Sequence, residues 1–222
     1  LEGYGNEGTK KVFMKHGAKE PVFGVKVQDL KKIQKKIKKD YELALELYAT
    51  GNSDAMYFAG LIADETQMTK EDLESWVQAA YWYYLAEYTV PQVAGETPHG
   101  FDLATRWIES DSEQVASAGW ATLTFLSSLR QDADLDLEAF SSLLDRAVGE
   151  IPGAQNRVRY AMNGFVIAVG CNIVGLTDKA SACAEKIGKV SVDMGGTACK
   201  VPLATQYIQK VVDRGTVGKK RK

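Results

Sequence analysis

An aromatic ring and a carboxylate stand four residues apart in a strongly aromatic stretch of the chain, residues 76–88. If this stretch is helical, Tyr83 and Glu87 share one face, because residues i and i+4 are neighbours on a helix surface. The face of a ring and a carboxylate both attract positive charge, so the pair suits a cationic ligand. The same spacing also fits an aromatic core helix that carries one solvated acid. The sequence leaves both interpretations open.

A second candidate site lies in residues 194–202, where two glycines are followed by Lys200 and then by Pro202. Proline suits the first turn of a helix, so we expect a helix to begin here. The backbone N–H groups of that helix start, together with Lys200, could hold a phosphate. A plain loop between two helices is the alternative, because glycine pairs near a lysine are common in loops.

Most other catalytic chemistry finds no support in the sequence. The two histidines, His16 and His99, lie in a lysine-rich leader and in a Pro-Gly turn, where neither has an evident nucleophile or acid partner. The three cysteines are far apart and form no CxxC pair, which argues against a disulfide framework or a zinc site. The phosphate-binding GxxxxGK[ST] loop and the HExxH motif are missing as well. We therefore expect no metal and no cofactor.

The net charge of −2 hides a strongly uneven distribution. Residues 1–39 hold 11 lysines and 4 acids, residues 40–150 hold 4 basic and 21 acidic residues, and residues 151–222 hold 12 basic and 4 acidic residues. Basic blocks of this kind are typical of surfaces that bind polyanions such as nucleic acids. Lysine-rich helix faces that are merely solvated are the alternative. The acidic middle must face away from any bound nucleic acid, because it would repel it.

The apolar residues recur with helical spacing along most of the chain. Val27, Leu30, Ile33 and Ile37 form one such series, with lysines on the rest of the turn, and only residues 190–194 are predicted to be extended. Helix pairs recur every 35 to 45 residues, as in HEAT-type arrays. The sequence thus predicts one all-α domain over residues 1–222, a HEAT-like solenoid of helical pairs. Its leader (1–24) and its basic tail (215–222) could be flexible.

Two stretches carry a family resemblance. The first is GVKVQDLKKIQKKIKKDYELALELYATGNSDAMYFAGLIADETQMT, and the second combines RVRYAMNGFVIAVG with KIGKVSVDMGGTACKVP. They resemble the AlkD-type DNA alkylation repair family of HEAT-like proteins, the second stretch being similar to its shorter branch. The resemblance implies an all-helical solenoid with a basic concave groove for DNA. Its active members excise cationic N3- or N7-alkylated purines, whose positive charge already makes them good leaving groups.

The catalytic motif of the active members is a tryptophan, an aspartate four residues later, and an arginine on a later helix. On this chain the resemblance places the tryptophan position at Tyr83 and the aspartate position at Glu87. The arginine position falls within residues 115–119, at Ser117 or beside it, where no basic residue stands. Glutamate is one methylene longer than aspartate, and a displacement of about 1 Å can cost about a hundredfold in rate.

Three functions follow as hypotheses. The first is a DNA-binding protein that holds duplex, alkylated or branched DNA, and the second is an active glycosylase in which Tyr83 and Glu87 excise alkylated purines. The third is a helical scaffold for a protein partner, since HEAT-like arrays commonly bind proteins. The residues predicted to contact DNA phosphates are Lys31, Lys35, Lys38, Lys39, Arg157, Arg159 and Lys200. With unpaired cysteines and no apolar run long enough for a membrane span, we expect a cytoplasmic protein with no membrane partner.

Overall fold

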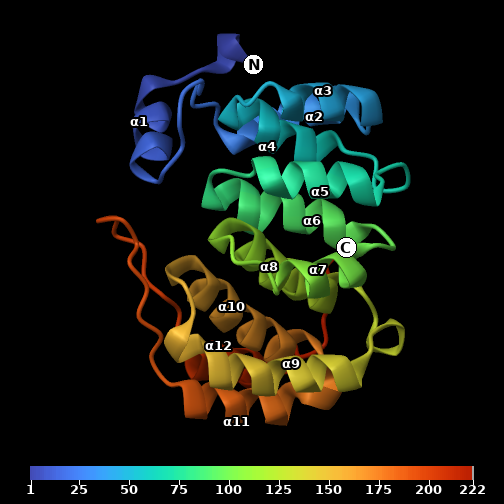
Figure 1. The fold of residues 1–222 in the computed structure, drawn as a ribbon, viewed down its shortest axis with the longest axis vertical. Coiled ribbons are helices and arrows are strands. Elements are labelled where there is room, and N and C mark those ends of the chain that lie inside the picture. Colours follow the sequence, from blue (N-terminus) through green and yellow to red (C-terminus); the bar gives the residue numbers. More distant parts are fainter. Residues whose placement is uncertain (222) are drawn as a thin grey trace.

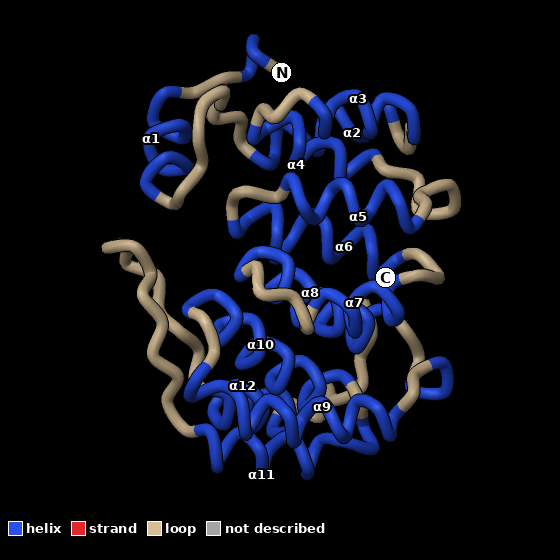
Figure 2. Tube along the Cα trace, viewed as in Figure 1, coloured by secondary structure: helices blue, strands red, loops and turns tan. Residues whose placement is uncertain are grey.

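The computed structural model describes residues 1–221 and shows a stack of helices along the long axis of the molecule (Figure 1). Within those residues there are helices, loops and turns but no strand, which confirms the all-α prediction (Figure 2). The α-helices are α1 (Glu7–Lys15), α2 (Val27–Ile37), α3 (Tyr41–Ala49), α4 (Ser53–Ile62), α5 (Lys70–Ala79), α6 (Val90–Glu96), α7 (Gly100–Trp107), α8 (Glu113–Leu129), α9 (Leu137–Glu150), α10 (Asn156–Asn172), α11 (Thr177–Ile187) and α12 (Ala204–Asp213). Short helical turns are η1 (Glu2–Tyr4), η2 (Leu85–Thr89), η3 (Asp132–Asp134), η4 (Ile151–Gly153) and η5 (Val174–Leu176).

Helix α8 is the centre of the hydrophobic core. Its Val115 and Ala118 belong to the cluster formed by the N-terminal helices, and its Trp120 and Leu123 belong to the cluster formed by the C-terminal helices. A side chain at Gly119 would place its Cβ only 2.7 Å from the backbone nitrogen of Ile108, so glycine lets α8 approach the end of α7. Helix α8 therefore links the two halves of the stack and fixes where its neighbours lie.

The N-terminal leader packs against the helical stack through Asp54, at the start of α4. The buried Asp54 carboxylate accepts hydrogen bonds from the backbone N–H groups of Phe23 (2.6 Å), Gly24 (3.0 Å) and Val25 (2.7 Å). Farther along, the Trp82 indole donates to the His16 carbonyl at 2.7 Å. These contacts join residues 16 and 23–25, which follow helix α1, to the helical stack, and the flexibility of residues 1–24 stays a prediction.

The aromatic stretch is not one continuous helix. Helix α5 ends at Ala79, and a new helix starts at Tyr83 and runs into α6. Residues Leu85–Thr89 of this new helix form the π-helical turn η2. Such turns are rare and are often found at functional sites. Glu87 lies at the centre of this one and is buried.

Two C-terminal segments lie outside the regular helical stack. Residues 188–203 form a long loop that extends along one side of the molecule (Figure 2), and residues 190–194, which were predicted to be extended, belong to this loop and not to a strand. Asn156 holds this loop, because its side chain exchanges two hydrogen bonds with the backbone of Asp193, at 2.7 and 2.9 Å. The following helix begins at Ala204 rather than at Pro202.

The predicted basic tail packs against the stack as far as it is described. The Lys220 ammonium, with its side chain only 7% exposed, donates to the Ser127 carbonyl, the Asn172 carbonyl and the Asp132 carboxylate. The backbone N–H of Arg221 donates to the Ser128 carbonyl at 2.8 Å. Lys222, the last residue of the predicted tail, lies outside the described residues.

No single described helix has the length and apolar composition of a membrane span. Helix α10 together with residues 174–187 reaches that composition, but only as a pair bent by 117°.

We predict that Asp54→Ala destabilises the protein by about 3 kcal/mol, because hydrogen bonds from three backbone donors to one buried carboxylate are lost. Urea unfolding measures the loss, and limited proteolysis should show faster cleavage within residues 1–24. Asp64→Ala is the control, since Asp64 is also bonded by local N–H and hydroxyl groups but at an exposed turn. Equal losses for the two variants would contradict the role given to Asp54.

Candidate nucleic-acid interface

A buried ion pair joins η2 to α10. The Arg157 guanidinium donates from Nε to Oε1 of Glu87 (2.7 Å) and from Nη2 to Oε2 (2.5 Å). The Glu87 side chain is 4% exposed and the Arg157 side chain 15% exposed. Two parallel hydrogen bonds of this kind orient both groups and are stronger than bonds between neutral groups. Glu87 and Arg157 are 70 residues apart in the sequence, so only the tertiary fold brings them together.

Aromatic rings enclose the guanidinium on its remaining faces. The Arg157 guanidinium carbon lies 4.4 Å from the centre of the Tyr83 ring and 4.5 Å from the centre of the Tyr160 ring. The Tyr83 hydroxyl is hydrogen-bonded to Nδ1 of His16 at 2.9 Å, which ties the cluster to the end of the leader helix. Tyr83 and Glu87 therefore do contact a cation, and this cation is the Arg157 guanidinium of the same chain.

A second acid holds the backbone of Arg157. The Glu113 carboxylate of α8 accepts the backbone N–H of Arg157 at 2.8 Å, in the first turn of α10, where backbone donors have no partner within the helix. This bond sets the register of α10 against α8. It also places a second negative charge near Glu87, which adds to the need for a guanidinium at this position.

Burial governs the protonation of the pair. It raises the pKa of the Glu87 carboxyl, while the hydrogen bonds from Arg157 act in the opposite direction. Burial is the largest single influence on Arg157 and opposes its charged form, but the hydrogen bonds to Glu87 and the negative charge of Glu87 together outweigh it, so the pKa of the guanidinium is raised. Because both oxygens of Glu87 already accept from Arg157, this carboxylate is not free to stabilise a developing positive charge on a sugar.

A cavity of about 190 Å³ opens beside the ion pair. Ser117, at the position where the resemblance places a catalytic arginine, lines it and donates its hydroxyl proton to the Gln114 carbonyl at 3.0 Å. Arg157 lines the same cavity from α10. Among the described residues that line this cavity, Arg157 alone carries a guanidinium, and that group comes from a different helix and neutralises Glu87. The cavity is lined by His16, Gly17, Tyr81, Trp82, Tyr83, Ala86, Glu87, Glu113, Gln114, Ser117 and Arg157.

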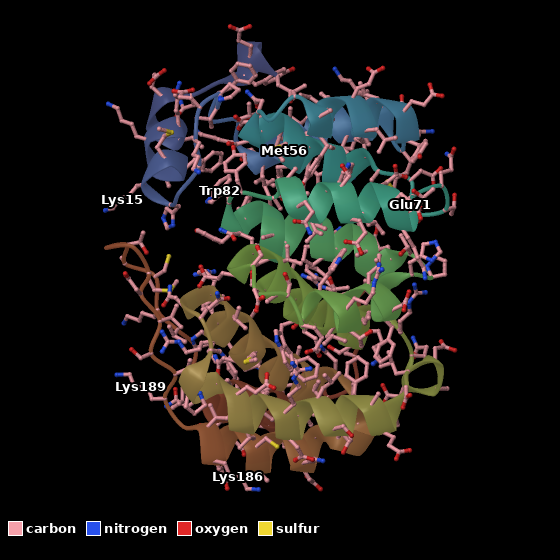
Figure 3. The ribbon with its side chains drawn as sticks, viewed as in Figure 1. Lys15, Met56, Glu71, Trp82, Lys186 and Lys189 are labelled. Carbon is pink, nitrogen blue, oxygen red and sulfur yellow. The ribbon has the colours of Figure 1, made fainter. Side chains whose placement is uncertain are left out.

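The residues predicted to contact phosphates do not form one cluster. Lys31, Lys35 and Lys38 are exposed on or just after α2, at the N-terminal end of the stack, while exposed Lys200 lies in the 188–203 loop (Figure 1). Figure 3 shows Lys15 and Lys189 on the same side of the molecule and Glu71 on the opposite side. Lys15 and Lys189, which come from opposite ends of the chain, thus lie on one side of the molecule.

Three of the predicted contacts are already engaged or shielded within the protein. Lys39 lies 3.1 Å from a Glu65 carboxylate oxygen and 3.8 Å from a Glu96 carboxylate oxygen. Arg157 pairs with Glu87, as described above. Arg159 is half-buried, and its Nε is shielded from solvent without a hydrogen-bond partner. The exposed lysines are therefore better placed for phosphate contacts than the two arginines of α10.

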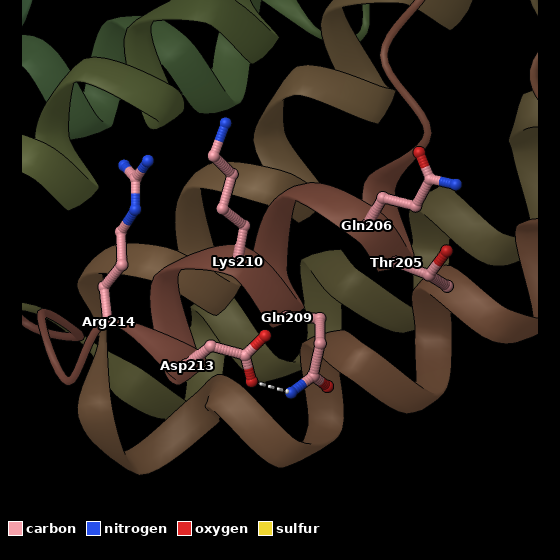
Figure 4. A pocket seen from close by; sticks show the side chains of 6 residues that line it. All are labelled: Thr205, Gln206, Gln209, Lys210, Asp213 and Arg214. Carbon is pink, nitrogen blue, oxygen red and sulfur yellow. Dashed lines mark hydrogen bonds between the residues drawn. The ribbon is translucent and has the colours of Figure 1, made fainter.

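A larger hollow, of about 690 Å³, lies along the exposed face of α12 (Figure 4). It is lined by polar residues of that helix and its end, among them Lys210 and Arg214, and a hydrogen bond of 2.7 Å joins Gln209 to Asp213. None of its lining residues belongs to the Glu87–Arg157 cluster, so it is no part of the candidate site.

The ion pair generates a prediction about stability. Arg157→Leu should cost about 3–5 kcal/mol, because it leaves the Glu87 carboxylate buried and unpaired. The double variant Glu87→Gln/Arg157→Leu should recover most of that loss, since no charge then remains in the site. Urea unfolding of both variants checks this, and a double variant that is less stable than Arg157→Leu would contradict it.

Comparisons with known proteins identify the family and the fold of this chain. The family described as "DNA alkylation repair enzyme" matches residues 1–172. The uncharacterized proteins Lin0241 of Listeria innocua and Lmo0209 of Listeria monocytogenes are each 34% identical over 220 residues, which is 96% of this chain and 95% of theirs.

A solved structure with 41% sequence identity has a TM-score of 0.92 and covers 100% of this chain and 94% of its own. It is described as "a new family of proteins related to the HEAT-like repeat DNA glycosylases with affinity for branched DNA structures". With a family match over most of its length and relatives above 30% identity over nearly all of it, this chain belongs to the DNA alkylation repair enzyme family and has its HEAT-like repeat fold.

Proposed function

We propose that the protein is a single-domain DNA-binding member of this family that recognises branched DNA and does not excise bases. The observation that favours binding over excision is the Glu87–Arg157 ion pair. Excision of an alkylated purine needs an electrostatic partner for the oxocarbenium-like sugar, and the partner must be free when that charge develops. Here the carboxylate at the catalytic position is buried and bonded through both oxygens.

The distribution of basic residues supports binding to diverging DNA arms. Lys31 and Lys35 are exposed on α2, whereas Lys189 and Lys200 are exposed in the 188–203 loop, which extends along one side of the molecule (Figure 2). A junction carries phosphates in several directions, so two separated basic regions can each contact an arm. Such contacts confer affinity without base specificity. The affinity for branched DNA described for the structural relative supports this choice of substrate.

The three free cysteines favour the cytoplasm as the place of action.

Salt dependence tests the binding. Affinity for a four-way junction should fall steeply between 50 and 200 mM salt, because each neutralised phosphate releases counterions. Lys35→Glu should weaken binding and reduce the slope of log K against log salt by about 1. Lys70→Glu is the matched control, since it makes the same charge change at the start of α5, beside Glu71, which lies on the opposite side of the molecule from Lys15 and Lys189 (Figure 3). Salt-independent affinity, or no preference for the junction over linear duplex, would refute the proposal.

Base release tests the absence of excision. Wild-type protein incubated with methylated DNA should release no 7-methylguanine above the protein-free background, as should Glu87→Gln. The measurement is chromatography of the released bases. Release by the wild type that disappears in Glu87→Gln would instead assign the carboxylate a catalytic role.

A further inference from the structure

A second cavity, of about 400 Å³, begins next to the ion pair and is not used by the proposed function. Glu87 borders both cavities, and Tyr160, which stacks on Arg157, lines this second one. Three aromatic side chains contribute to its lining, together with small residues of α8 and α10. The lining consists of Glu87, Tyr88, Ala121, Thr124, Phe125, Ser128, Tyr160, Ala161, Gly164, Asn172, Pro202 and Arg221.

Close packing within the described structure does not require a glycine at position 164. It lies in the middle of α10, where glycine is among the least favourable residues for a helix. A Cβ at Gly164 would meet no atom within 4 Å, whereas a Cβ at Gly170 of the same helix would lie 2.6 Å from Ile208. Glycine at position 170 thus permits close packing, but at position 164 its effect is to leave the cavity open. Missing side chains of this kind occur where a ligand approaches the backbone closely.

A cation is held at the edge of this cavity. The Arg221 guanidinium carbon lies 5.5 Å from the centre of the Phe125 ring, and no ion pair involves Arg221 among the described residues. The preceding Lys220 is anchored by three hydrogen bonds, so the chain delivers Arg221 to this place. The cavity therefore combines flat aromatic surfaces with a guanidinium that can pair with a phosphate.

The polar groups of α8 define what kind of ring fits. Thr124 donates its hydroxyl proton to the Trp120 carbonyl, and Ser128 donates its proton to the Phe125 carbonyl. Both oxygens can then only accept further hydrogen bonds. A ring with amino groups suits them, as in adenine, guanine or cytosine. The volume falls within the range of about 300–1,000 Å³ that is typical of small-ligand cavities.

We propose that this cavity binds one unpaired, amino-bearing nucleobase of a DNA strand, with Arg221 on its phosphate. The inference rests on the proposed DNA binding and goes beyond it. Unpaired bases occur at branch points, where taking a base out of the stack costs least. Stacking on aromatic side chains accepts a single-stranded base with little dependence on sequence.

Filling the cavity tests the inference. The substrate is a branched DNA with one unpaired adenine at the branch point, compared with the same DNA carrying an abasic site there. The wild type should bind the adenine form about tenfold more tightly, as expected for one stacked base. Gly164→Leu should abolish this preference and leave the affinity for the abasic form unchanged. Gly149→Leu is the matched control, since Gly149 is an exposed helical glycine that does not line this cavity.

The outcomes separate the two proposals. Loss of all DNA binding in the wild type refutes the proposed function, whereas normal binding without the adenine preference refutes only the cavity inference. Gly164→Leu should melt at or above the wild-type temperature, because leucine favours a helix more than glycine does. If it melts lower, the smaller Gly164→Ala replaces it and should reduce the preference partially. If Gly164→Ala and Gly164→Leu both fold stably and both keep the full preference for the unpaired adenine, the inference is overturned.

A second arm distinguishes a DNA base from a free nucleotide. Deoxyadenosine monophosphate, titrated calorimetrically without DNA, should bind far more weakly than the branched DNA. The opposite result has two parts: the nucleotide binds tightly and Gly164→Leu abolishes that binding, while the protein shows no preference for the unpaired adenine in DNA. This result would show that the cavity binds a free nucleotide and would overturn the proposal that it binds a base of DNA.

Discussion

The ion pair between Glu87 and Arg157 is the constraint on which the rest of the site depends. A carboxylate that is 4% exposed needs a charged, hydrogen-bonded partner, because its burial alone would be strongly unfavourable. Arg157 meets that need and spans from η2 to α10. Any arrangement of η2 and α10 that separates Glu87 from Arg157 leaves a buried charge without a partner. The ion pair therefore fixes their relative position and at the same time removes the carboxylate from other chemistry.

The surrounding structure holds this pair from several directions. Glu113 of α8 binds the backbone of Arg157, Tyr83 and Tyr160 cover the guanidinium, and His16 fixes Tyr83. The leader thus reaches the site through His16, and Asp54 keeps the leader in place by capping its last residues. A cluster held this firmly is preorganised, which suits a binding surface of fixed shape. Glu87 itself borders both of the cavities described above.

Local features of the fold were predictable from nearby residues. Asp40 accepts the backbone N–H of Leu43 as a helix cap, and Thr69 and Asp72 form a reciprocal capping box, as their spacing predicts. Ser112 stands at the cap position of α8, but its side chain makes no cap hydrogen bond. The break after Ala79 and the π-helical turn η2 were not predictable, since the aromatic stretch has no proline or glycine to mark them. Packing against other helices decides such breaks.

The sequence alone determined the helical class and the uneven charge, because each depends on composition or on spacings of a few residues. Only the tertiary structure decided that Arg157, 70 residues away, neutralises Glu87, and that Arg221 comes to Phe125. Partners at such separations leave no periodic signal in the sequence. Whether a carboxylate is free or consumed depends on burial and on which charge lies within hydrogen-bonding distance, and both are properties of the packed molecule.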